Sequence, residues 1–183
     1  MPLPDYYDQS AMRALDPKCA SPTSLDSKRT VAQLSEQPAA YKDSFLRWST
    51  YWDLGSLVRC ALEAKISADT KTDETQAAPM LGVAAFFDSL RALKALVAGG
   101  ANLELPDRGG STALAWASRE GHLACLQVLI KAGANPNAQD VLGNTPRCEA
   151  VVHKRSDCVR ALFFLCPTCS SSLATAVSLF MQR

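Results

Sequence analysis

Apolar residues in this chain recur at the spacing of short amphipathic helices, most regularly in residues 107–139. There, Thr112 is placed to cap a short apolar helix, and a break at Glu120-Gly121-His122 separates it from a second one. Gly133 ends the second helix, because glycine readily takes the left-handed conformation of a helix end. That helix carries the apolar residues Leu123, Leu126, Val128, Leu129 and Ile130. The pattern predicts turn, helix, turn and helix, a unit too small to bury its own apolar face.

The unit recurs on both sides at a fixed period of 33 residues. The matching upstream positions are Leu81, Ala84, Leu90, Leu93, Leu96 and Gly100-Ala101-Asn102. The matching downstream positions are Asp140, Gly143, Thr145, Ala150, Cys158 and Leu162. A fixed period of this length indicates a solenoid, in which stacked units share one core.

The repeat resembles the ankyrin-repeat family. The resemblance is carried by Thr112-Ala113-Leu114-Ala115-Trp116-Ala117, by Gly121-His122 and by Gly133-Ala134-Asn135-Pro136-Asn137. Ala113 and Ala115 replace the proline and histidine of the family signature, whereas Thr145-Pro146 keeps the proline in the next copy. The resemblance implies an all-α solenoid of stacked helix-turn-helix units with short β-turn fingers.

The chain divides into a leader, an array of repeats and a C-terminal helix. Residues 1–40 are rich in proline and predict a largely disordered flexible leader, with one short helix within residues 27–37. Repeats are expected over 41–169, divided into a degenerate copy 41–73, two regular copies 74–106 and 107–139, and an irregular end 140–169. The degenerate copy aligns at an offset of 68 residues and ends in Lys65-Ile66-Ser67, followed by an exposed linker over 68–77. Residues 170–183 predict a helix that either caps the array, begins a further repeat or meets a partner.

Charge and composition narrow the classes of partner. The net charge of +1 provides no basic footprint for nucleic acid, and the longest apolar runs are too short to cross a membrane. The N-terminus lacks the basic and apolar blocks of a signal peptide, so we expect none. Seven cysteines, mostly single, suit reduced thiols in a cytoplasmic or nuclear protein, which we expect to be monomeric.

One motif suggests a redox or metal-binding site. Cys166-Pro167-Thr168-Cys169 has the spacing of a redox dithiol, but no strand pattern flanks it. It would supply half of a zinc site, and the nearby Cys148, His153 and Cys158 match no known zinc module. No catalytic triad or phosphate-binding loop is suggested. We therefore predict no enzyme, no metal and no cofactor.

The resemblance implies that another protein binds the finger tips and the inner-helix face. Carried over by position, the fingers contribute Thr75, Gln76 and Ala78, then Arg108, Gly109 and Ser111, then Val141, Leu142 and Asn144. The inner helices contribute Tyr51 and Trp52, Phe86 and Phe87, Arg119 and Glu120, and Val152 and His153. This predicts a groove with an aromatic half (Tyr51, Trp52, Phe86, Phe87) and a polar half (Arg119, Glu120, His153). Alternatively, the leader or the first repeat folds over the rings and makes them core.

The predicted function is a non-catalytic protein-protein interaction module that serves as an adaptor, an inhibitor or a targeting arm. One alternative is the substrate-recognition arm of a larger assembly such as a ubiquitin ligase. The other is a metal or redox protein that uses Cys166 and Cys169.

Overall fold

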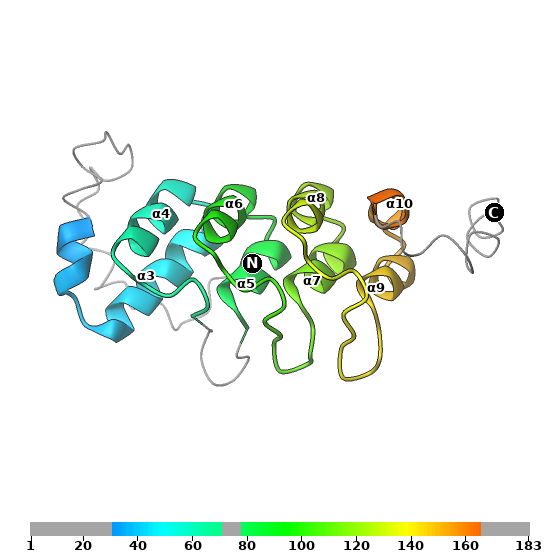
Figure 1. Ribbon diagram of the computed structural model, residues 1–183, viewed down its shortest axis with the longest axis horizontal. Helices are drawn as coiled ribbons and strands as arrows, with labels where there is room; N and C mark the ends of the chain where they lie inside the picture. Colours follow the sequence, from blue (N-terminus) through cyan, green and yellow to red (C-terminus); the bar gives the residue numbers. More distant parts are fainter. Residues whose placement is uncertain (1–30, 71–77, 166–183) are drawn as a thin grey trace, which may run out of the picture.

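A computed structural model describes residues 31–70 and 78–165 of the chain as a row of helix pairs (Figure 1). A short helix covers residues 31–36. It is followed by α3 (Ala39–Tyr51), α4 (Gly55–Glu63), α5 (Met80–Phe86), α6 (Leu90–Ala98), α7 (Ala113–Glu120), α8 (Leu123–Lys131), α9 (Pro146–Val152) and α10 (Ser156–Leu165). The inner helices α3, α5, α7 and α9 form one layer and the outer helices α4, α6, α8 and α10 form the other (Figure 1). The predicted all-α solenoid is confirmed.

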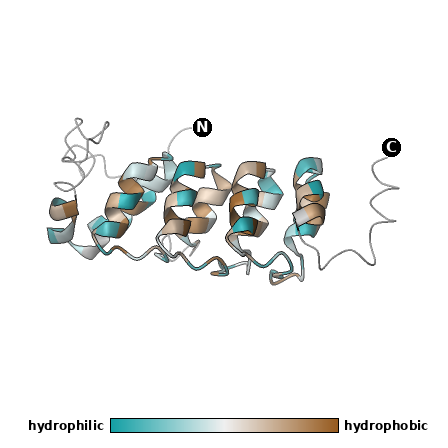
Figure 2. Ribbon diagram, turned by 45° about the horizontal axis from the view of Figure 1, so that its top comes forward, coloured by the Kyte–Doolittle hydropathy of each residue, from teal (hydrophilic) through white to brown (hydrophobic). Residues whose placement is uncertain are grey.

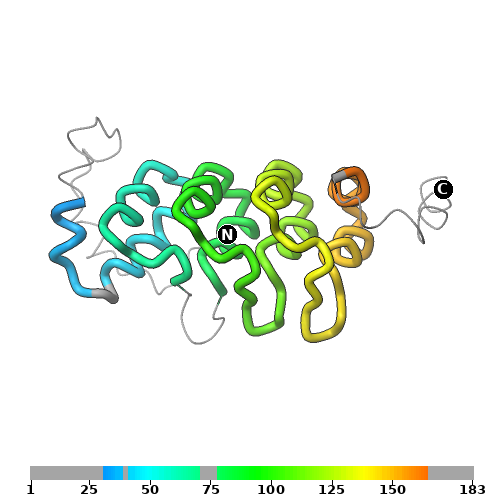
Figure 3. Tube along the Cα trace, viewed as in Figure 1, coloured from blue at the N-terminus to red at the C-terminus, as the bar shows by residue number. Residues whose placement is uncertain are grey.

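Local sequence signals set where the inner helices α7 and α9 begin. Thr112 caps α7, where its hydroxyl accepts a hydrogen bond from the Ala115 amide at 3.4 Å. Thr145 caps α9 in the same way, and Pro146 occupies the first turn, where its missing N–H costs nothing. The loops before these inner helices project to the same side as fingers, as the chain path in Figure 3 shows. The caps therefore set where each finger ends and each inner helix begins.

The backbone of the first helix pair turns in the same way as that of the following pairs. The turn between inner and outer helix takes a left-handed residue in each pair: Asp53 (φ 53°), Asp88 (φ 56°), Gly121 (φ 87°) and Lys154 (φ 56°). The step from Asp53 to Gly121 is the offset of 68 residues expected for a connection two residues longer than usual. The first pair is thus a repeat of the same kind, despite its weak sequence pattern.

The core lies between the two layers and runs through all four pairs. Figure 2 shows apolar and hydrophilic residues alternating around the helices, as expected when one face of each helix is buried. The largest fully buried apolar side chains include Leu46, Leu81, Leu93, Leu96, Leu114, Leu126, Leu129 and Leu162. Burying one such leucine contributes about 1.5–3 kcal/mol to folding. Because these leucines recur with the repeat, each junction between repeats is stabilised in the same way.

Hydrogen bonds from one repeat to the next fix the stacking register. The Asp53 carboxylate accepts from the Ala92 amide at 2.8 Å, near the start of the next outer helix. In the loops, the Glu104 carboxylate accepts from the Asn135 amide at 2.7 Å. Each bond satisfies a backbone donor that a helix or loop start would otherwise leave without an acceptor. The repeats are therefore joined by directional contacts as well as by the core.

A short helix within the range 27–37, where one was predicted, packs on the first repeat. Leu34 is only 2% exposed and belongs to the core, and Val31 packs against the same core. Residues 31–36 therefore pack on the first repeat instead of belonging to a flexible leader. At the other end of this repeat, Ile66 and Ala68 are buried, so the linker predicted to be exposed from residue 68 begins inside the core.

Several predictions fall on residues 1–30, 71–77 and 166–183, which lie outside the described residues. They concern most of the leader, Thr75 and Gln76 in the first finger, the Cys166–Cys169 dithiol and the helix in 170–183. Within the described ranges, no helix has the length and apolar content needed to cross a membrane.

Replacing Lys65 with glycine should stabilise the protein. Lys65 has φ 61° at the position where the regular repeats have Gly100 (φ 80°) and Gly133 (φ 96°). A left-handed backbone costs an L residue about 1–2 kcal/mol, and part of the gain is offset by the greater chain entropy of unfolded glycine, about 0.5–1 kcal/mol. We expect Lys65→Gly to raise the free energy of unfolding, measured by urea denaturation, by about 0.5–1 kcal/mol.

The control is Lys94→Gly, at an exposed position inside α6. There glycine should lower the free energy of unfolding by about 1 kcal/mol. A loss of stability in both variants would show that the Lys65 backbone is not strained.

Candidate protein-binding surface

The ends of α3 and α5, together with Trp116 in the middle of α7, bring five aromatic rings into one continuous row. Ring centroids lie 5.6 Å apart for Trp52 and Tyr51, 4.6 Å for Tyr51 and Phe87, 4.8 Å for Phe87 and Phe86, and 5.3 Å for Phe86 and Trp116. All four pairs meet edge to face, the arrangement in which the positive edge of one ring faces the negative face of the next. We call these five residues the aromatic row. It joins α3, α5 and α7 across two junctions between repeats.

The aromatic row is open to solvent along much of its length. Trp52 is 53% exposed, Phe87 46% and Phe86 39%, while Tyr51 and Trp116 are half-buried. The described part of the first repeat thus leaves Trp52, Phe86 and Phe87 exposed, and most of the leader, which the alternative would fold over these rings, lies outside the described residues. The rings pack on one another and still present apolar surface.

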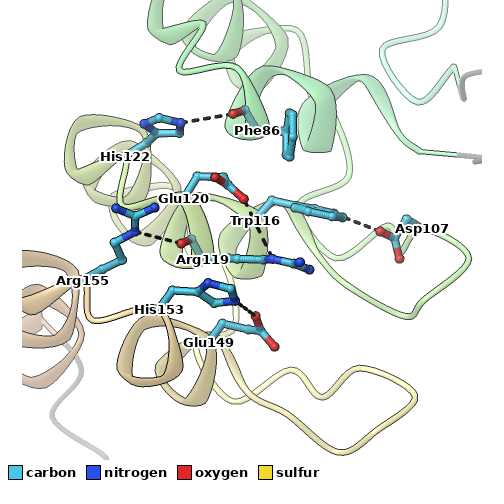
Figure 4. Close-up of polar contacts among 9 residues, drawn as sticks. All are labelled: Phe86, Asp107, Trp116, Arg119, Glu120, His122, Glu149, His153 and Arg155. Carbon is cyan, nitrogen blue, oxygen red and sulfur yellow. Dashed lines mark hydrogen bonds and ion pairs between the residues drawn. The ribbon is translucent and has the colours of Figure 1, made fainter.

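Trp116 is a member of the row that sequence reasoning missed. The prediction carried over only the residues that follow the last alanine of the family signature, and Trp116 precedes Ala117. Its position offered a signal, because residues three and four apart share a helix face and Arg119 and Glu120 follow at that spacing. The Trp116 indole Nε1 donates a hydrogen bond to the Asp107 Oδ2 at 2.9 Å (Figure 4). This bond ties the inner helix α7 to the finger before it.

A pocket of about 410 Å³ lies between α5, α7 and the finger that precedes α7. Its lining residues are Ala78, Gly82, Val83, Phe86, Phe87, Asp107, Arg108, Gly109 and Trp116. Most of these are apolar or aromatic, and the polar members come from the finger. The pocket thus combines the predicted inner-helix and finger positions Phe86, Phe87 and Arg108 in one site.

The two described fingers are held in shape by an aspartate at their base. Asp107 Oδ1 accepts from the amides of Gly109 at 2.8 Å and Ser111 at 2.9 Å. In the next finger Asp140 Oδ1 accepts from the amides of Leu142 at 2.9 Å and Asn144 at 2.7 Å. Such local bonds to backbone amides favour a tight turn.

The Asp140 carboxyl titrates below its ordinary range. Desolvation by itself raises its pKa, but hydrogen bonds from the backbone and side chain of Asn144 and from the backbone of Leu142 outweigh this and lower the pKa. The Asn144 amide also donates to Asp140 Oδ2 at 3.2 Å. Asn144, predicted as a contact residue, therefore also helps to hold the finger.

Exposed aliphatic residues extend the surface beyond the row. Val141 and Leu142 at the tip of the second described finger are 72% and 82% exposed, and Val152 at the end of α9 is 70% exposed. They do not line the pocket. The structure therefore places the predicted aliphatic positions on the surface but not in one cluster with the aromatic row.

The polar half of the predicted groove follows the aromatic row along the face of the inner helices. It consists of Arg119, Glu120 and His153. The Arg119 guanidinium lies 5.2 Å from the centre of the Trp116 ring, a cation–π arrangement, and its Nε is 3.9 Å from the Glu120 carboxylate. The His153 imidazole lies 3.6 Å from the Glu149 carboxylate, and Arg155 Nε donates to the Arg119 carbonyl oxygen at 3.1 Å (Figure 4). Exposed ion pairs of this kind contribute little to stability. These contacts instead hold the charged side chains in position beside the aromatic row.

His122 joins two neighbouring repeats. Its Nε2 lies 3.1 Å from the Phe86 carbonyl oxygen (Figure 4). Its Nδ1 lies 3.7 Å from the Asp88 carboxylate. The ring bridges the turn after α5 to the start of α8. It thereby supports the backbone that carries Phe86.

The chemistry available in the described residues is limited. No group of three or more His, Cys, Asp or Glu side chains in the described ranges could hold a metal ion. Among the described cysteines Cys60, Cys125, Cys148 and Cys158, none forms a disulfide, and Cys148 alone is exposed. Burial, together with a hydrogen bond from its thiol to Asp88, raises the pKa of Cys125 to about 12. Burial also raises the pKa of Cys158.

Fold and surface together define a repeat protein of the helical solenoid class. A family model described as ankyrin repeats, in three copies, matches residues 54–140 and 80–170. These ranges cover more than half of the chain, and the chain belongs to the ankyrin-repeat family. Ankyrin repeats generally mediate protein-protein interaction, and the family is one of non-enzymatic interaction modules.

Curated proteins similar to the chain include synphilin-1 of Mus musculus, 36% identical over 83 residues, or 45% of this chain and 8% of that protein. SH3 and multiple ankyrin repeat domains protein 2 of Homo sapiens is 38% identical over 78 residues, or 43% of this chain and 4% of that protein. Ankyrin repeat domain-containing protein 63 of Homo sapiens is 34% identical over 95 residues, or 51% of this chain and 25% of that protein. The matched stretch thus spans a quarter or less of each of these relatives.

The buried thiols should not be alkylated in the folded protein, and they should make the free energy of unfolding fall at alkaline pH. With iodoacetamide at mildly alkaline pH, we expect Cys148 to be alkylated in the folded protein and Cys125 and Cys158 only after unfolding, as read by peptide mass spectrometry. In the unfolded chain Cys125 titrates near 9.0, whereas in the folded chain it keeps its proton to about 12. Between these values the unfolded state binds fewer protons, so the free energy of unfolding falls as pH rises.

The matched variants are Cys125→Ala and Cys148→Ala. Cys125→Ala should reduce the fall in the free energy of unfolding at alkaline pH. Cys148→Ala should leave that fall unchanged. Rapid alkylation of Cys125 in the folded protein would contradict the assignment of a buried, protonated thiol.

Proposed function

We propose that this chain is a non-catalytic protein-binding module whose partner docks on the inner-helix face across the aromatic row. The observation that carries the proposal is the row itself: five rings from three repeats in continuous edge-to-face contact, with three of them substantially exposed. Solvent-exposed apolar surface of this extent marks an interaction site in proteins. Aromatic side chains are also the enriched anchors of protein interfaces.

Preorganisation supports the same proposal. Each ring in the row contacts at least one neighbour, and Trp116 is also tied to its finger by the indole hydrogen bond to Asp107. A partner that binds rings already held in place does not have to order them, so less side-chain entropy is lost on binding. The proposed contact residues are the aromatic row, Arg108, Ser111, Arg119, Glu120 and His153, with Val141, Leu142, Asn144 and Val152 at the periphery.

The module would act as an adaptor, an inhibitor or a targeting arm. The same face would serve the recognition arm of a larger assembly, since in the three relatives the matched stretch is one part of a longer protein. The proposal has a single chain engage its partner in the cytoplasm or nucleus, a setting that suits the described cysteines, none of which forms a disulfide.

Removing the two central rings should weaken partner binding. The change is Phe86→Ala with Phe87→Ala, in the full chain. Interface hot spots contribute about 2 kcal/mol or more each, so we expect at least a tenfold loss of affinity for protein partners recovered by affinity capture with the unmodified chain. Because the rings are partly exposed, the free energy of unfolding in urea should fall only by about 1–2 kcal/mol, the size of the ring contacts removed.

Phe164→Ala is the matched control, because Phe164 is 84% exposed on α10 and lies outside the row. It should leave both partner recovery and stability unchanged. Partners that are retained by the double variant and lost by Phe164→Ala would place the interface at the end of the array instead. Partners retained by both variants, with stability lost in the double variant, would make the row structural.

A further inference from the structure

The two described fingers pair with each other along their backbones. The Val141 amide, in the finger 140–144, donates a hydrogen bond to the Gly109 carbonyl oxygen of the preceding finger at 2.9 Å. Gly110 lets the two backbones approach this closely, because a β-carbon at that glycine would lie 2.9 Å from the Val141 nitrogen. The finger 107–111 therefore accepts a neighbouring backbone along one of its edges.

The finger 140–144 repeats the backbone geometry of the finger 107–111. In both, the amide of the first residue donates to the carbonyl oxygen of the fifth, at 3.1 Å in the finger 107–111 and 3.0 Å in the finger 140–144. The amide of the fourth residue donates to the carbonyl oxygen of the first at the same two distances. That fourth residue is a glycine with positive φ in both fingers, 77° and 82°. Leu142 therefore holds the position of Gly109, with its carbonyl oxygen on the corresponding edge.

This edge of the finger 140–144 has no neighbour in the described part of the chain. The Leu142 carbonyl oxygen accepts no hydrogen bond from a described residue, and the Leu142 side chain is 82% exposed. Among the described residues, apart from the two chain neighbours of Gly143, no heavy atom lies within 4 Å of the place where its β-carbon would stand. We call the Leu142 carbonyl group and Gly143 the open edge.

The inner helix that follows the open edge is uncovered on the corresponding side. Cys148 and Val151 of α9 are exposed. The residues at the same positions of α7, Ala115 and Ser118, are buried. α7 lies between two inner helices, α5 and α9, whereas among the described helices α9 has an inner helix on one side only (Figure 1). The side of the fourth repeat that carries the open edge is therefore accessible to a partner.

The open edge pairs only with a segment that brings its own N–H group. All five amides of the finger 140–144 already have acceptors within the chain. Four of them bond inside the finger, and the Val141 amide bonds to Gly109. Two copies of the chain that met symmetrically through their open edges would set one carbonyl oxygen against another, without a donor between them. The occupant that fits is a backbone with a free amide, from a different protein.

We infer that the open edge binds an extended segment of a partner protein, whose backbone passes over Gly143 and donates one amide to the Leu142 carbonyl oxygen. The segment takes the place that the finger 140–144 itself holds on the finger 107–111, a form of strand addition. An aliphatic side chain of the segment packs on Leu142 or on Val141, which is 72% exposed. The open edge is a second binding site, separate from the aromatic row, because neither residue lines the pocket beside that row.

A library of random linear peptides displayed on phage and selected on the full chain tests the inference. Each enriched peptide is made synthetically, and its affinity for the full chain and its variants is measured by fluorescence anisotropy. Peptides that bind the Phe86→Ala, Phe87→Ala double variant as well as the unmodified chain are those that do not use the aromatic row. We expect these peptides to contain aliphatic residues and to lose affinity in Gly143→Asn.

Gly143→Asn places a side chain where the partner backbone would pass, and asparagine tolerates the left-handed backbone there. It should weaken binding by about tenfold or more, because the hydrogen bond to the Leu142 carbonyl oxygen is lost. Gly133→Asn is the matched control, since Gly133 follows α8 with φ 96° and equally open surroundings. It should leave the affinity within about twofold. Thermal melts confirm that both variants are folded.

A second pair of variants tests the side-chain contact without changing a glycine. Leu142→Ala should weaken binding by about threefold to tenfold, because the buried aliphatic surface becomes smaller. Phe164→Ala is its control, because Phe164 is similarly exposed, at 84%, on the outer helix α10. It should leave the affinity within about twofold.

Methylation of single backbone amides in the strongest peptide tests the predicted donor. Methylation of the amide that donates to the Leu142 carbonyl oxygen should weaken binding by about tenfold, the size of one lost hydrogen bond. Retained affinity at every methylated position would show that no backbone amide is used and would overturn the inference.

Two further results would overturn the inference. One is that no peptide depends on Gly143, the outcome when another part of the chain or a second copy takes the open edge. The other is an equal loss of affinity in Gly143→Asn and Gly133→Asn, which would make the effect one of backbone strain. Retention of captured proteins by the Phe86→Ala, Phe87→Ala variant bears on the aromatic row alone, so failure of the two sites is told apart.

Discussion

The constraint on which this molecule depends is that no helix pair in it can bury its own apolar face. The fully buried leucines lie at equivalent positions of successive repeats, such as Leu81 and Leu114 on α5 and α7, where each is enclosed by the neighbouring pair. Stability therefore comes from the junctions, and each added pair extends one continuous core. The directional bonds between repeats, such as Asp53 to the Ala92 amide, then fix how far one pair is rotated on the next.

This construction separates the residues that hold the fold from those that present a surface. The core uses the face between the layers, which leaves the ends of the inner helices and the fingers free to vary. The positions at the end of α5 are occupied by Phe86 and Phe87, and those at the end of α7 by Arg119 and Glu120. The aromatic row is the result of placing large rings at these positions in adjacent repeats, where the stacking brings them within contact of one another.

The fourth repeat shows how the array changes at its far side. Arg147 stands at the position of Leu114, and its guanidinium lies 4.5 Å from the centre of the Phe163 ring. The Arg147 side chain thus replaces the apolar packing of a leucine by a cation–π arrangement with the outer helix α10 of its own repeat.

Local signals in the sequence determined the period, the caps and the helix limits of this protein, because each depends on residues within one turn. Thr112 starts a helix where it was expected to, and Thr145 and Pro146, which keep the signature of the family, start the next inner helix. The exposure of Phe86 and Phe87 agrees with their predicted place on the surface. Only the tertiary structure brought Trp116 into the row, joined Leu34 to the core and set Arg119 over the indole ring. These depend on how far one repeat is rotated and shifted against the next, and that geometry is set by packing between residues that lie a whole repeat or more apart.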